Sequence, residues 1–452
     1  MGTTETVDVC IIGAGLAGLR AAQRLSEQGL SVRVLEARER VGGRTAGGLL
    51  CGEAIDLGGQ WLGSGQTRAL ALCKELGLNL YEQHSIGKRI LSIDNKSRSY
   101  QGKAPPIPLL GLLDSSQIIW RLNRAAKTID PAAPWTSKNA AYWDRMTVAE
   151  WLQRNLHTKS AHSLMKIIMR ALHTSEPHEV SMLCLLASIA SAGGLETQLE
   201  ARGNGAQRYK ISGGAFQLAE LLAKKLPNES LLLNAPVLAV KQSETHVTIT
   251  HAKGEVCASK VIVALAPVLA TRINFEPALP SARLQLQSRM PMGSVIKVLV
   301  AYERPFWREQ GLTGEAISDT EAFSPVADAT PHGSKNGFLV GFFAGKFGQA
   351  MAGMDKQTRR EIAVQSLQHY FGPQAAHPID YIDQNWISES WSLGGYTSIT
   401  SPGTLTSCGY TLRTPCGRIH WSGSETATEW TGYIDGAISS GERVAEEILA
   451  AR

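Results

Sequence analysis

Three glycines near the start of the chain have the spacing of a dinucleotide-binding turn. Gly13, Gly15 and Gly18 form a GxGxxG motif, and Glu36 ends the apolar stretch that comes next. In such a motif the first glycine permits a tight turn, the second lets the backbone approach a pyrophosphate, and the third lets helix and strand pack closely. The helix amides then bind the phosphates, and a carboxylate such as Glu36 accepts hydrogen bonds from a ribose.

A second glycine pair follows this motif and indicates a larger ligand. Gly42 and Gly43 precede Arg44, which could meet a phosphate, and residues 56–61 form a further glycine turn where flat rings could pass. A nicotinamide site does not need these additions, so the pattern favours FAD over NAD. We expect the cofactor to be bound by Gly13, Ala14, Gly15, Gly18, Glu36, Arg38, Gly43, Arg44, Gly59, Gln60 and Trp61.

Lys297 is a charged residue in an otherwise apolar run, residues 295–300. Burying an unpaired ammonium is costly, so such a lysine either reaches an exposed edge or is held by a specific partner. Its position alone favours the exposed edge, because lysine is almost never fully buried. The residues by themselves leave both interpretations open.

Apolar runs and helical spacing predict the elements that position these residues. A strand over residues 7–12, a helix that ends near Gln28 and a parallel strand over residues 31–35 make one βαβ unit around the glycine motif. The other expected elements are a helix that begins at the capping box Thr147–Glu150, a mostly helical region over 140–200, strands at 247–250 and 261–264 with Gly254 in the turn between them, and an amphipathic helix over 434–449.

Length and composition exclude several classes of protein. A chain of 452 residues predicts two or three domains, and 43% hydrophobic with 19% charged residues excludes dominant disorder. The net charge of +5 is spread along the chain, which argues against nucleic-acid binding and a polybasic membrane anchor. No apolar stretch reaches about 18 residues, so no transmembrane helix is expected. The seven cysteines form no CxxC pair, so we expect no disulfide framework and no metal site, and a cytoplasmic location.

Over nearly its whole length the chain resembles the flavin-dependent amine oxidases, and more closely the monoamine oxidases. The matching stretches occur in the family's order with similar gaps, which makes the resemblance more specific than the nucleotide motif alone. They are residues 34–44, 204–207, 213–214, 293–297, 305–307, 395–397 and 422–433.

The resemblance implies a fold and a reaction. The expected fold is α/β, a two-domain FAD-dependent oxidoreductase with a discontinuous Rossmann-like FAD domain and an inserted α+β substrate domain. The FAD domain would comprise residues 1–84, 212–288 and 390–452, and the substrate domain residues 85–211 and 289–389. Enzymes of this family remove a hydride equivalent from the carbon next to nitrogen, which gives an imine that water hydrolyses. Oxygen then reoxidises the flavin and yields hydrogen peroxide.

The resemblance also implies roles for single residues. Lys297 matches a lysine that holds a water near flavin N5, and Tyr396 and Tyr433 match two facing tyrosines in front of the flavin. An alkylamine has a pKa of about 10.4, so it arrives protonated, whereas oxidation needs the nitrogen lone pair. An aromatic slot orients nitrogen without fixing its charged form. The substrate cavity would be lined by Gln207, Leu172, Leu199 and Phe342.

Further cofactor contacts follow from the same resemblance. Val237 matches a backbone contact to adenine, and Trp386 matches a tryptophan that packs beside the isoalloxazine. Glu425 and Thr426 match the part of the family site that binds the pyrophosphate and ribityl groups. A carboxylate near phosphate needs a bridging donor, for which Arg44 or a water is the candidate. The helix that opens near residue 434 would direct its positive end at the flavin.

Two departures from the eukaryotic monoamine oxidases change the expectation. Those enzymes attach FAD through a cysteine just before the first of the two tyrosines, and here Gly395 stands at that position. We therefore expect non-covalent FAD. The chain also stops at Arg452, where those enzymes continue into a membrane tail, so a soluble protein is expected.

Several alternatives stay open. A desaturase or a polyamine oxidase of the same superfamily is one alternative. A polyamine oxidase should line its entrance with carboxylates, for which Glu196 and Glu200 are candidates, and a cyclic, nicotine-type amine oxidase fits the same motifs. A non-catalytic FAD-binding protein is the alternative of a different class, although such a protein has no need of Lys297, Tyr396 and Tyr433 together. The expected partners are an amine and O2, with no nucleic acid and no membrane. The oligomeric state is open, with a homodimer among the alternatives.

Overall fold

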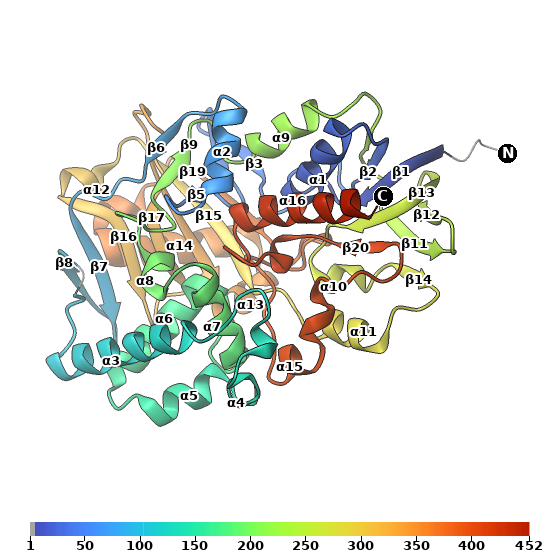
Figure 1. Cartoon of the computed structure of the whole chain (residues 1–452). Coiled ribbons are helices and arrows are strands. Elements are labelled where there is room, and N and C mark those ends of the chain that lie inside the picture. The colour runs from blue at the N-terminus through green and yellow to red at the C-terminus, as the bar shows by residue number, and fades with distance from the viewer. Residues whose placement is uncertain (1–4, 103, 452) are drawn as a thin grey trace.

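Two large β-sheets organise residues 5–102 and 104–451, which the computed structural model of the chain describes (Figure 1). The first sheet contains the predicted βαβ unit, and its strands β10, β2, β1, β13 and β20 run parallel. Its members, in spatial order, are β10 (Leu231–Leu232), β2 (Val32–Leu35), β1 (Glu5–Ile12), β13 (Gly254–Val263), β12 (Val247–His251), β11 (Val237–Gln242) and β14 (Asn274–Glu276), with β20 (Ile419–Trp421) beside β13.

The predicted βαβ unit is confirmed. Helix α1 (Leu16–Glu27) connects β1 to β2, and Ile12 lies opposite Leu35 in the parallel register. The prediction for the later hairpin was partly wrong, because Gly254 belongs to β13 and pairs with His251, so the turn is residues 252–253. Strand β13 is longer than predicted because it pairs with β12 on one side and with β1 on the other.

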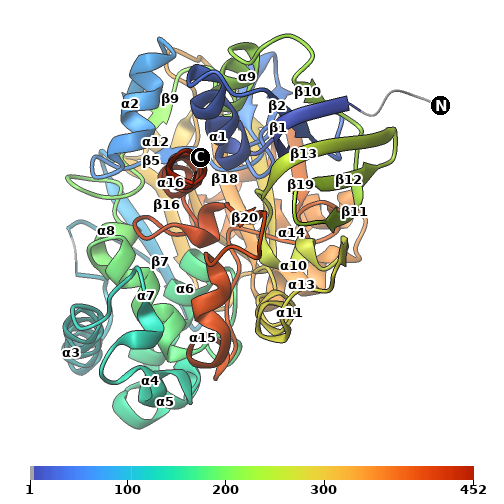
Figure 2. The same cartoon turned by 45° about the vertical axis from the view of Figure 1, so that its right-hand side comes forward.

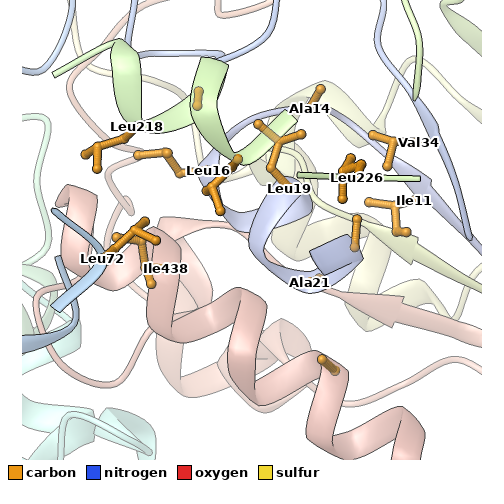
Figure 3. Close-up of a cluster of buried hydrophobic side chains, with 14 of the residues drawn as sticks. Ile11, Ala14, Leu16, Leu19, Ala21, Val34, Leu72, Leu218, Leu226 and Ile438 are labelled. Atoms are coloured by element: carbon orange, nitrogen blue, oxygen red, sulfur yellow. The ribbon is translucent and has the colours of Figure 1, made fainter. Parts of the chain in front are cut away.

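Helices cover one face of the first sheet and share a core with it. Helix α16 (Ile434–Ala450), the predicted amphipathic helix, lies along α1, and Figure 2 shows both beside the parallel strands. Their close approach depends on Gly441, where a Cβ would lie 2.4 Å from the Ala17 carbonyl oxygen. Helices α2 (Thr67–Glu75) and α9 (Gln217–Lys224) complete this layer. The buried side chains that meet there include Leu19, Leu72, Leu218 and Ile438, drawn in Figure 3.

The second large sheet contains the apolar run around Lys297. Every residue of β15 (Val295–Tyr302) and β18 (Gly337–Ala344) is buried, because neighbouring strands flank both and side chains pack on both faces. In spatial order the sheet consists of β19 (Asp380–Asn385), β15, β18, β17 (Phe323–Asp328), β16 (Leu312–Ser318), β7 (Lys88–Ile93) and β8 (Lys96–Tyr100). Two small sheets are formed by β5 (Trp61–Leu62), β9 (Tyr209–Ile211) and β6 (Leu80–Glu82), and by β3 (Gly47–Leu50) and β4 (Glu53–Asp56).

A separate group of helices fills the region that was predicted to be helical. The capping box is confirmed, since Thr147 and Glu150 exchange hydrogen bonds at the start of α5. The group consists of α3 (Leu109–Ala126), α4 (Ala140–Asp144), α5 (Val148–Asn155), α6 (Lys159–His173), α7 (Met182–Ser191) and α8 (Leu195–Leu199). The remaining α-helices are α10 (Pro267–Ala270), α11 (Ser281–Ser288), α12 (Phe306–Glu309), α13 (Lys346–Ala352), α14 (Lys356–Phe371) and α15 (Thr404–Cys408).

The predicted α/β class is confirmed, and each large sheet is assembled from distant parts of the chain. The first sheet draws its strands from residues 5–35, 231–276 and 419–421, and the second from residues 88–100, 295–344 and 380–385. The domain boundaries near residues 84, 211, 288 and 389 stay predictions. Among the described residues, no helix has both the length and the apolar character needed to cross a membrane.

Candidate active site

A cavity of about 610 Å³ is lined by residues of both large sheets. At one end it is lined by the turn after β1 and the end of β2, and at the other by β15, β16, β17 and β18. Of the cofactor, substrate and catalytic residues predicted from the sequence, those that line it are Gly13, Gly15, Glu36, Arg38, Gly43, Arg44, Gly59, Gln60, Trp61, Leu172, Leu199, Gln207, Val237, Lys297, Phe342, Trp386, Tyr396 and Tyr433. Glu196 and Glu200, the carboxylates considered for a polyamine, line it as well. Ala14, Gly18, Glu425 and Thr426 are outside that lining.

The glycine motif forms the backbone cradle at one end. Gly13 has φ +102°, a conformation that favours glycine, and a Cβ on Gly15 would meet no atom within 4 Å. A Cβ on Gly18 would lie 2.0 Å from the Gly13 carbonyl oxygen, so Gly18 is needed for packing and not for contact with a ligand. The buried Glu36 accepts a hydrogen bond from the Ala14 amide at 2.7 Å and from the Arg38 amide at 3.0 Å.

Arg44 is a cationic group that lines the cradle, and Glu425, which lies outside the cavity lining, holds its guanidinium in place. The two guanidinium nitrogens donate to the two Glu425 oxygens at 2.6 and 2.9 Å, and one also donates to the Tyr396 carbonyl oxygen at 2.9 Å. Burial opposes ionisation of Glu425, but the Arg44 charge and hydrogen bonds outweigh it and lower its pKa below the ordinary value. Glu425 is therefore a support for Arg44, which lines the cavity. Thr426 donates to the Gly423 carbonyl oxygen at 2.9 Å.

Lys297 is buried and held by specific partners, so the exposed-edge interpretation does not apply. Its side chain is 2% exposed, and Nζ donates to the Gly58 carbonyl oxygen at 2.8 Å and to Oε1 of Gln60. Burial lowers the pKa of Lys297, and the attraction of the nearby Asp56 carboxylate offsets only part of that effect. An amine in this setting can change its protonation state far more easily than a surface lysine can.

Aromatic rings surround the cavity beside Lys297. The rings of Phe342 and Tyr396 meet edge to face at 5.5 Å between centroids, and those of Phe342 and Trp61 are 6.3 Å apart. Burial raises the pKa of Tyr396 and of Tyr433, so both hydroxyls stay neutral. Trp386 is fixed by a hydrogen bond from its indole nitrogen to the Leu57 carbonyl oxygen at 3.0 Å. We call the space bounded by Trp61, Phe342, Tyr396 and Tyr433 the aromatic chamber.

A charged cluster lines the same cavity, and sequence reasoning named only one of its members, Glu200. Arg89 of β7 pairs with Glu200 at 2.9 Å and with Glu315 of β16 at 2.5 Å. Glu196, the other carboxylate considered from the sequence, accepts a hydrogen bond from Asn123 at 2.7 Å. Arg89 and Glu315 come from separate parts of the chain and share no motif with Glu200, so no local signal identified them.

His173 was also missed. It lines the cavity at the end of α6 and is 3% exposed, and neither ring nitrogen has a hydrogen-bond partner among the described residues. Burial lowers the pKa of His173 to about 4, so the imidazole is neutral near pH 7. A lone histidine in a helical stretch gives no sequence signal that separates this position from an ordinary core position.

The residues present fit a flavin dinucleotide. The cradle is open at Gly15, the Arg44 guanidinium and the Glu36 carboxylate line it, and aromatic rings line the same cavity beside Lys297. These are the groups that a pyrophosphate, a ribose and a flat ring system need. Gly13, Gly15, Arg44 and Glu36 would hold the dinucleotide part. Lys297 and the aromatic chamber would adjoin its ring system.

The comparisons with known proteins agree with this geometry. Residues 16–449 match the family model described as flavin containing amine oxidoreductase. AofH of Mycobacterium tuberculosis, whose name assigns it to the flavin-containing monoamine oxidases, is 39% identical over 445 residues, covering 98% of this chain and 97% of that protein. The structure of wild-type putrescine oxidase bound to putrescine has a TM-score of 0.95 at 34% identity, covering 99% of this chain and 100% of that one. Cyclohexylamine oxidase from Brevibacterium oxydans IH-35A has a TM-score of 0.94 at 32% identity, covering 98% and 99%.

Proposed function

The chain belongs to the flavin-containing amine oxidoreductase family, and we propose that it oxidises amines with an apolar body and passes the electrons to O2 as hydrogen peroxide. It is an FAD-dependent amine oxidase. The observation that carries the proposal is the buried Lys297 next to the aromatic chamber. A protein that merely binds FAD has no use for a desolvated amine at that position.

The side chains of the chamber suit a neutral amine. When bound, FAD supplies an acceptor for two electrons and one proton taken together from the carbon next to nitrogen. Tyr396 and Tyr433 present neutral ring faces, which orient the nitrogen without the full counter-ion that would fix its protonated form. Lys297 is proposed to hold a water beside the ring system and to act in reoxidation, and not as a base toward the amine.

The far part of the cavity sets the proposed substrate class. Leu172 and Leu199 lie there with further apolar residues, and Gln207 adds a polar group near the chamber. We propose that these residues, with Phe342, select a monoamine with a ring or short alkyl body. The apolar residues of the same wall include Ile119, Leu164, Ile167, Ile168, Ile317 and Val326.

One observation favours a second candidate, a diamine. Glu315 and Glu200 both meet Arg89 in the cavity lining, and a carboxylate there could pair with the distal ammonium of a diamine. Burial raises the pKa of Glu315, and a neutral Glu315 would favour an uncharged distal group instead. The charge of Glu315 is therefore one feature that distinguishes the two candidates.

A peroxide-coupled screen tests the proposed function. The panel is benzylamine, cyclohexylamine, phenethylamine, putrescine and a nicotine-type amine, each offered to wild type and to Glu315→Gln. A monoamine oxidase prefers the first three, and Glu315→Gln leaves that preference unchanged. Preference for putrescine that Glu315→Gln removes supports the diamine candidate. Flavin-loaded protein that releases no peroxide with any amine would be a non-catalytic FAD-binding protein.

We further propose that FAD is bound without a covalent bond. Gly395 precedes Tyr396, and among the described residues no cysteine lines the cavity.

The FAD domain is proposed to comprise residues 1–84, 212–288 and 390–452, and the substrate domain residues 85–211 and 289–389. The first sheet supports this division, because all of its strands, β20 included, lie within the three FAD segments.

Location and assembly belong to the same proposal. All seven cysteines are free thiols, which suits a reducing compartment, and we propose the cytoplasm.

Helix α3 exposes Leu109, Leu110, Leu113 and Trp120, each more than half exposed. These side chains support a homodimer, which light scattering after gel filtration would detect as twice the chain mass.

A further inference from the structure

A second, smaller cavity adjoins the site from a different direction. It has a volume of about 130 Å³ and is lined by buried Asp56, Gln60 and Lys210. Exposed Ser212 and His332 also line it, so it reaches the surface. A polar space of this size has room for several waters. We call it the rear cavity.

Gln60 lies between the rear cavity and the main cavity. Its side chain lines both, and its Oε1 accepts a hydrogen bond from Nζ of Lys297. Its Nε2 is buried and has no hydrogen-bond partner among the described residues. The Gln60 amide therefore stands between Lys297 and the rear cavity with a donor still unused, which is the arrangement expected beside an ordered water.

Asp56 and Lys210 place ionisable groups in the rear cavity. Oδ1 of Asp56 accepts from the Ala215 and Phe216 amides at 2.8 and 3.2 Å, which fixes the carboxylate. Lys210 lies opposite Trp61 and Tyr81 in the small sheet, with Nζ 5.2 Å from the Tyr81 ring centroid. Burial lowers the pKa of Lys210 to about 8 and raises the pKa of Asp56.

These groups also act on Lys297. The Asp56 carboxylate raises the pKa of Lys297, and the Lys210 ammonium lowers it. The charged groups that act on Lys210 itself are Asp328, Asp56 and Arg308. Three titratable side chains are thus buried within electrostatic reach of one another. Burying such groups is costly, and clusters of this kind occur preferentially at functional sites.

The proposed reaction creates a need for a proton on this side. The amine gives up a hydride, which is two electrons and one proton, from carbon and a second proton from nitrogen, and O2 takes up two electrons and two protons to become hydrogen peroxide. The nitrogen proton leaves with the iminium product or passes to solvent, so an equivalent proton must return from solvent when O2 is reduced. The aromatic chamber is apolar and holds substrate or product during this step, so it is a poor route for a proton.

We propose that the rear cavity is a water-filled proton route in which Asp56 and Lys210 exchange protons with solvent and set the protonation of Lys297. Asp56 and Lys210 are positioning residues, because neither lines the main cavity. Molecular oxygen is an unsuitable occupant, since a space lined by a carboxylate and an ammonium favours water over an apolar gas. The inference depends on the proposed oxidase function for its kinetic consequence.

The first test measures protonation directly and needs no turnover. The titration midpoint of Lys297 is followed by NMR in FAD-loaded protein labelled with ¹⁵N-lysine. Replacing Lys210 by Met removes a positive charge, so the midpoint of Lys297 moves to higher pH. Replacing Asp56 by Asn removes a negative charge and keeps the hydrogen-bond acceptor, so the midpoint moves to lower pH. The matched control is Lys335→Met, which alters an exposed lysine close to His332 in sequence and leaves the midpoint unchanged.

The second test separates the two half-reactions by rapid mixing. In Lys210→Met, reduction by amine keeps its rate, whereas reoxidation by O2 slows about tenfold or more and gains a larger solvent isotope effect. If Lys210→Met does not fold, Asp56→Asn provides the test. In that variant the titration midpoint of Lys297 is expected to move to lower pH instead of higher pH. An unchanged midpoint in a folded variant, or equal slowing of both half-reactions, would overturn the inference. A wild type that no amine reduces would end the oxidase proposal and leave the midpoint test standing.

Discussion

At the scale of single residues, the site depends on charged groups that are kept out of water. Lys297 lies in a strand whose every residue is buried, and Arg44 is aligned by a carboxylate that is itself 3% exposed. Buried charges are destabilising unless they are paired or hydrogen-bonded; Glu425 is paired with Arg44, and Lys297 is held by hydrogen bonds to Gly58 and Gln60. Their burial places fixed charge beside the space that FAD and an amine would occupy.

Replacing Lys297 by Met tests its proposed role. Methionine has similar length and fits an apolar strand, so the fold should be retained. Loss of the amine removes the group proposed to hold a water, and we expect reoxidation to slow on the order of 100-fold. Reduction by amine should change by no more than a few-fold. Stopped-flow measurement of both half-reactions checks this, and equal slowing of the two would contradict it.

Replacing Glu425 by Gln tests the support of Arg44. The change leaves the partly buried guanidinium of Arg44, whose side chain is 28% exposed, without its counter-ion. We expect a loss of about 3 kcal/mol in unfolding free energy, the low end for breaking a buried pair, and weaker FAD binding. The control is Glu429→Gln, because Glu429 is 65% exposed and its pair with Arg68 should contribute less than about 1 kcal/mol. Urea unfolding of both variants gives the comparison, and equal losses would contradict this role for Glu425.

The same carboxylate predicts a pH dependence of stability. The folded-state pKa of Glu425 is lowered, so its contribution is complete above the unfolded pKa of about 4.3 and disappears as pH falls through the folded value. Wild type should therefore lose stability more steeply than Glu425→Gln below about pH 4.3. Parallel curves for the two proteins in that range would show that Glu425 is not held ionised.

Sequence reasoning succeeded at residues that belong to a motif and failed at residues that do not. The burial of Lys297 could not be read from its neighbours, because an apolar strand with one lysine fits an exposed edge equally well. Arg89, Glu315 and His173 meet the cavity from three separate elements. Only the folded chain brings them together, and no spacing rule links them.

At the scale of elements, the segment from β1 into α1 needs glycine at two positions for two different reasons. At Gly15 a side chain would enter open space, whereas at Gly18 it would collide with the Gly13 carbonyl oxygen. The first glycine thus keeps space for a ligand and the second lets α1 pack on β1. The structure thus assigns ligand approach to Gly15 and helix packing to Gly18, as the motif predicts.

This difference gives a prediction with a built-in control. Gly15→Ala should fold with nearly unchanged thermal stability and lose FAD affinity by about 1–3 kcal/mol, roughly 5- to 150-fold, because its methyl group occupies the ligand's space. Gly18→Ala should lower the thermal stability of the FAD-free protein, because backbone must shift. Calorimetry with and without FAD measures both. Similar behaviour of the two variants would contradict the separation of roles.

Local elements were predictable and their long-range pairing was not. The βαβ unit, the capping box of α5 and helix α16 each follow from patterns within about twenty residues. The parallel pairing of β7 with β16 joins residues 88–92 to residues 312–318, and no local pattern specifies such a partner. The predicted start of β13 was also wrong, because pairing with β1 extends the strand back to Val256 and pairing with β12 extends it to Gly254.

At the scale of the whole molecule, the cavity exists because the two large sheets are interleaved along the chain. Each sheet collects strands from three parts of the sequence, so the cradle and the aromatic chamber meet although Gly15 and Tyr433 are far apart in the chain. The resemblance to a known family conveyed this arrangement, and composition and periodicity could not have done so.

The mode of FAD attachment is a property of the whole assembled site. With Gly395 before Tyr396 and no cysteine among the described lining residues, we expect acid precipitation to release all flavin into the supernatant. Absorbance of the supernatant and of the dissolved pellet measures the partition. A pellet that keeps its yellow colour after washing would contradict non-covalent binding.

The central claim is that the chamber beside Lys297 brings a bound flavin and a neutral amine into reactive contact. The most direct measurement is anaerobic addition of an amine from the panel to FAD-loaded protein while the visible flavin absorbance is recorded. We predict that the absorbance is bleached by a stoichiometric amount of amine and returns when O2 is admitted. Protein that binds no FAD, or whose flavin stays oxidised with every amine, would contradict the claim.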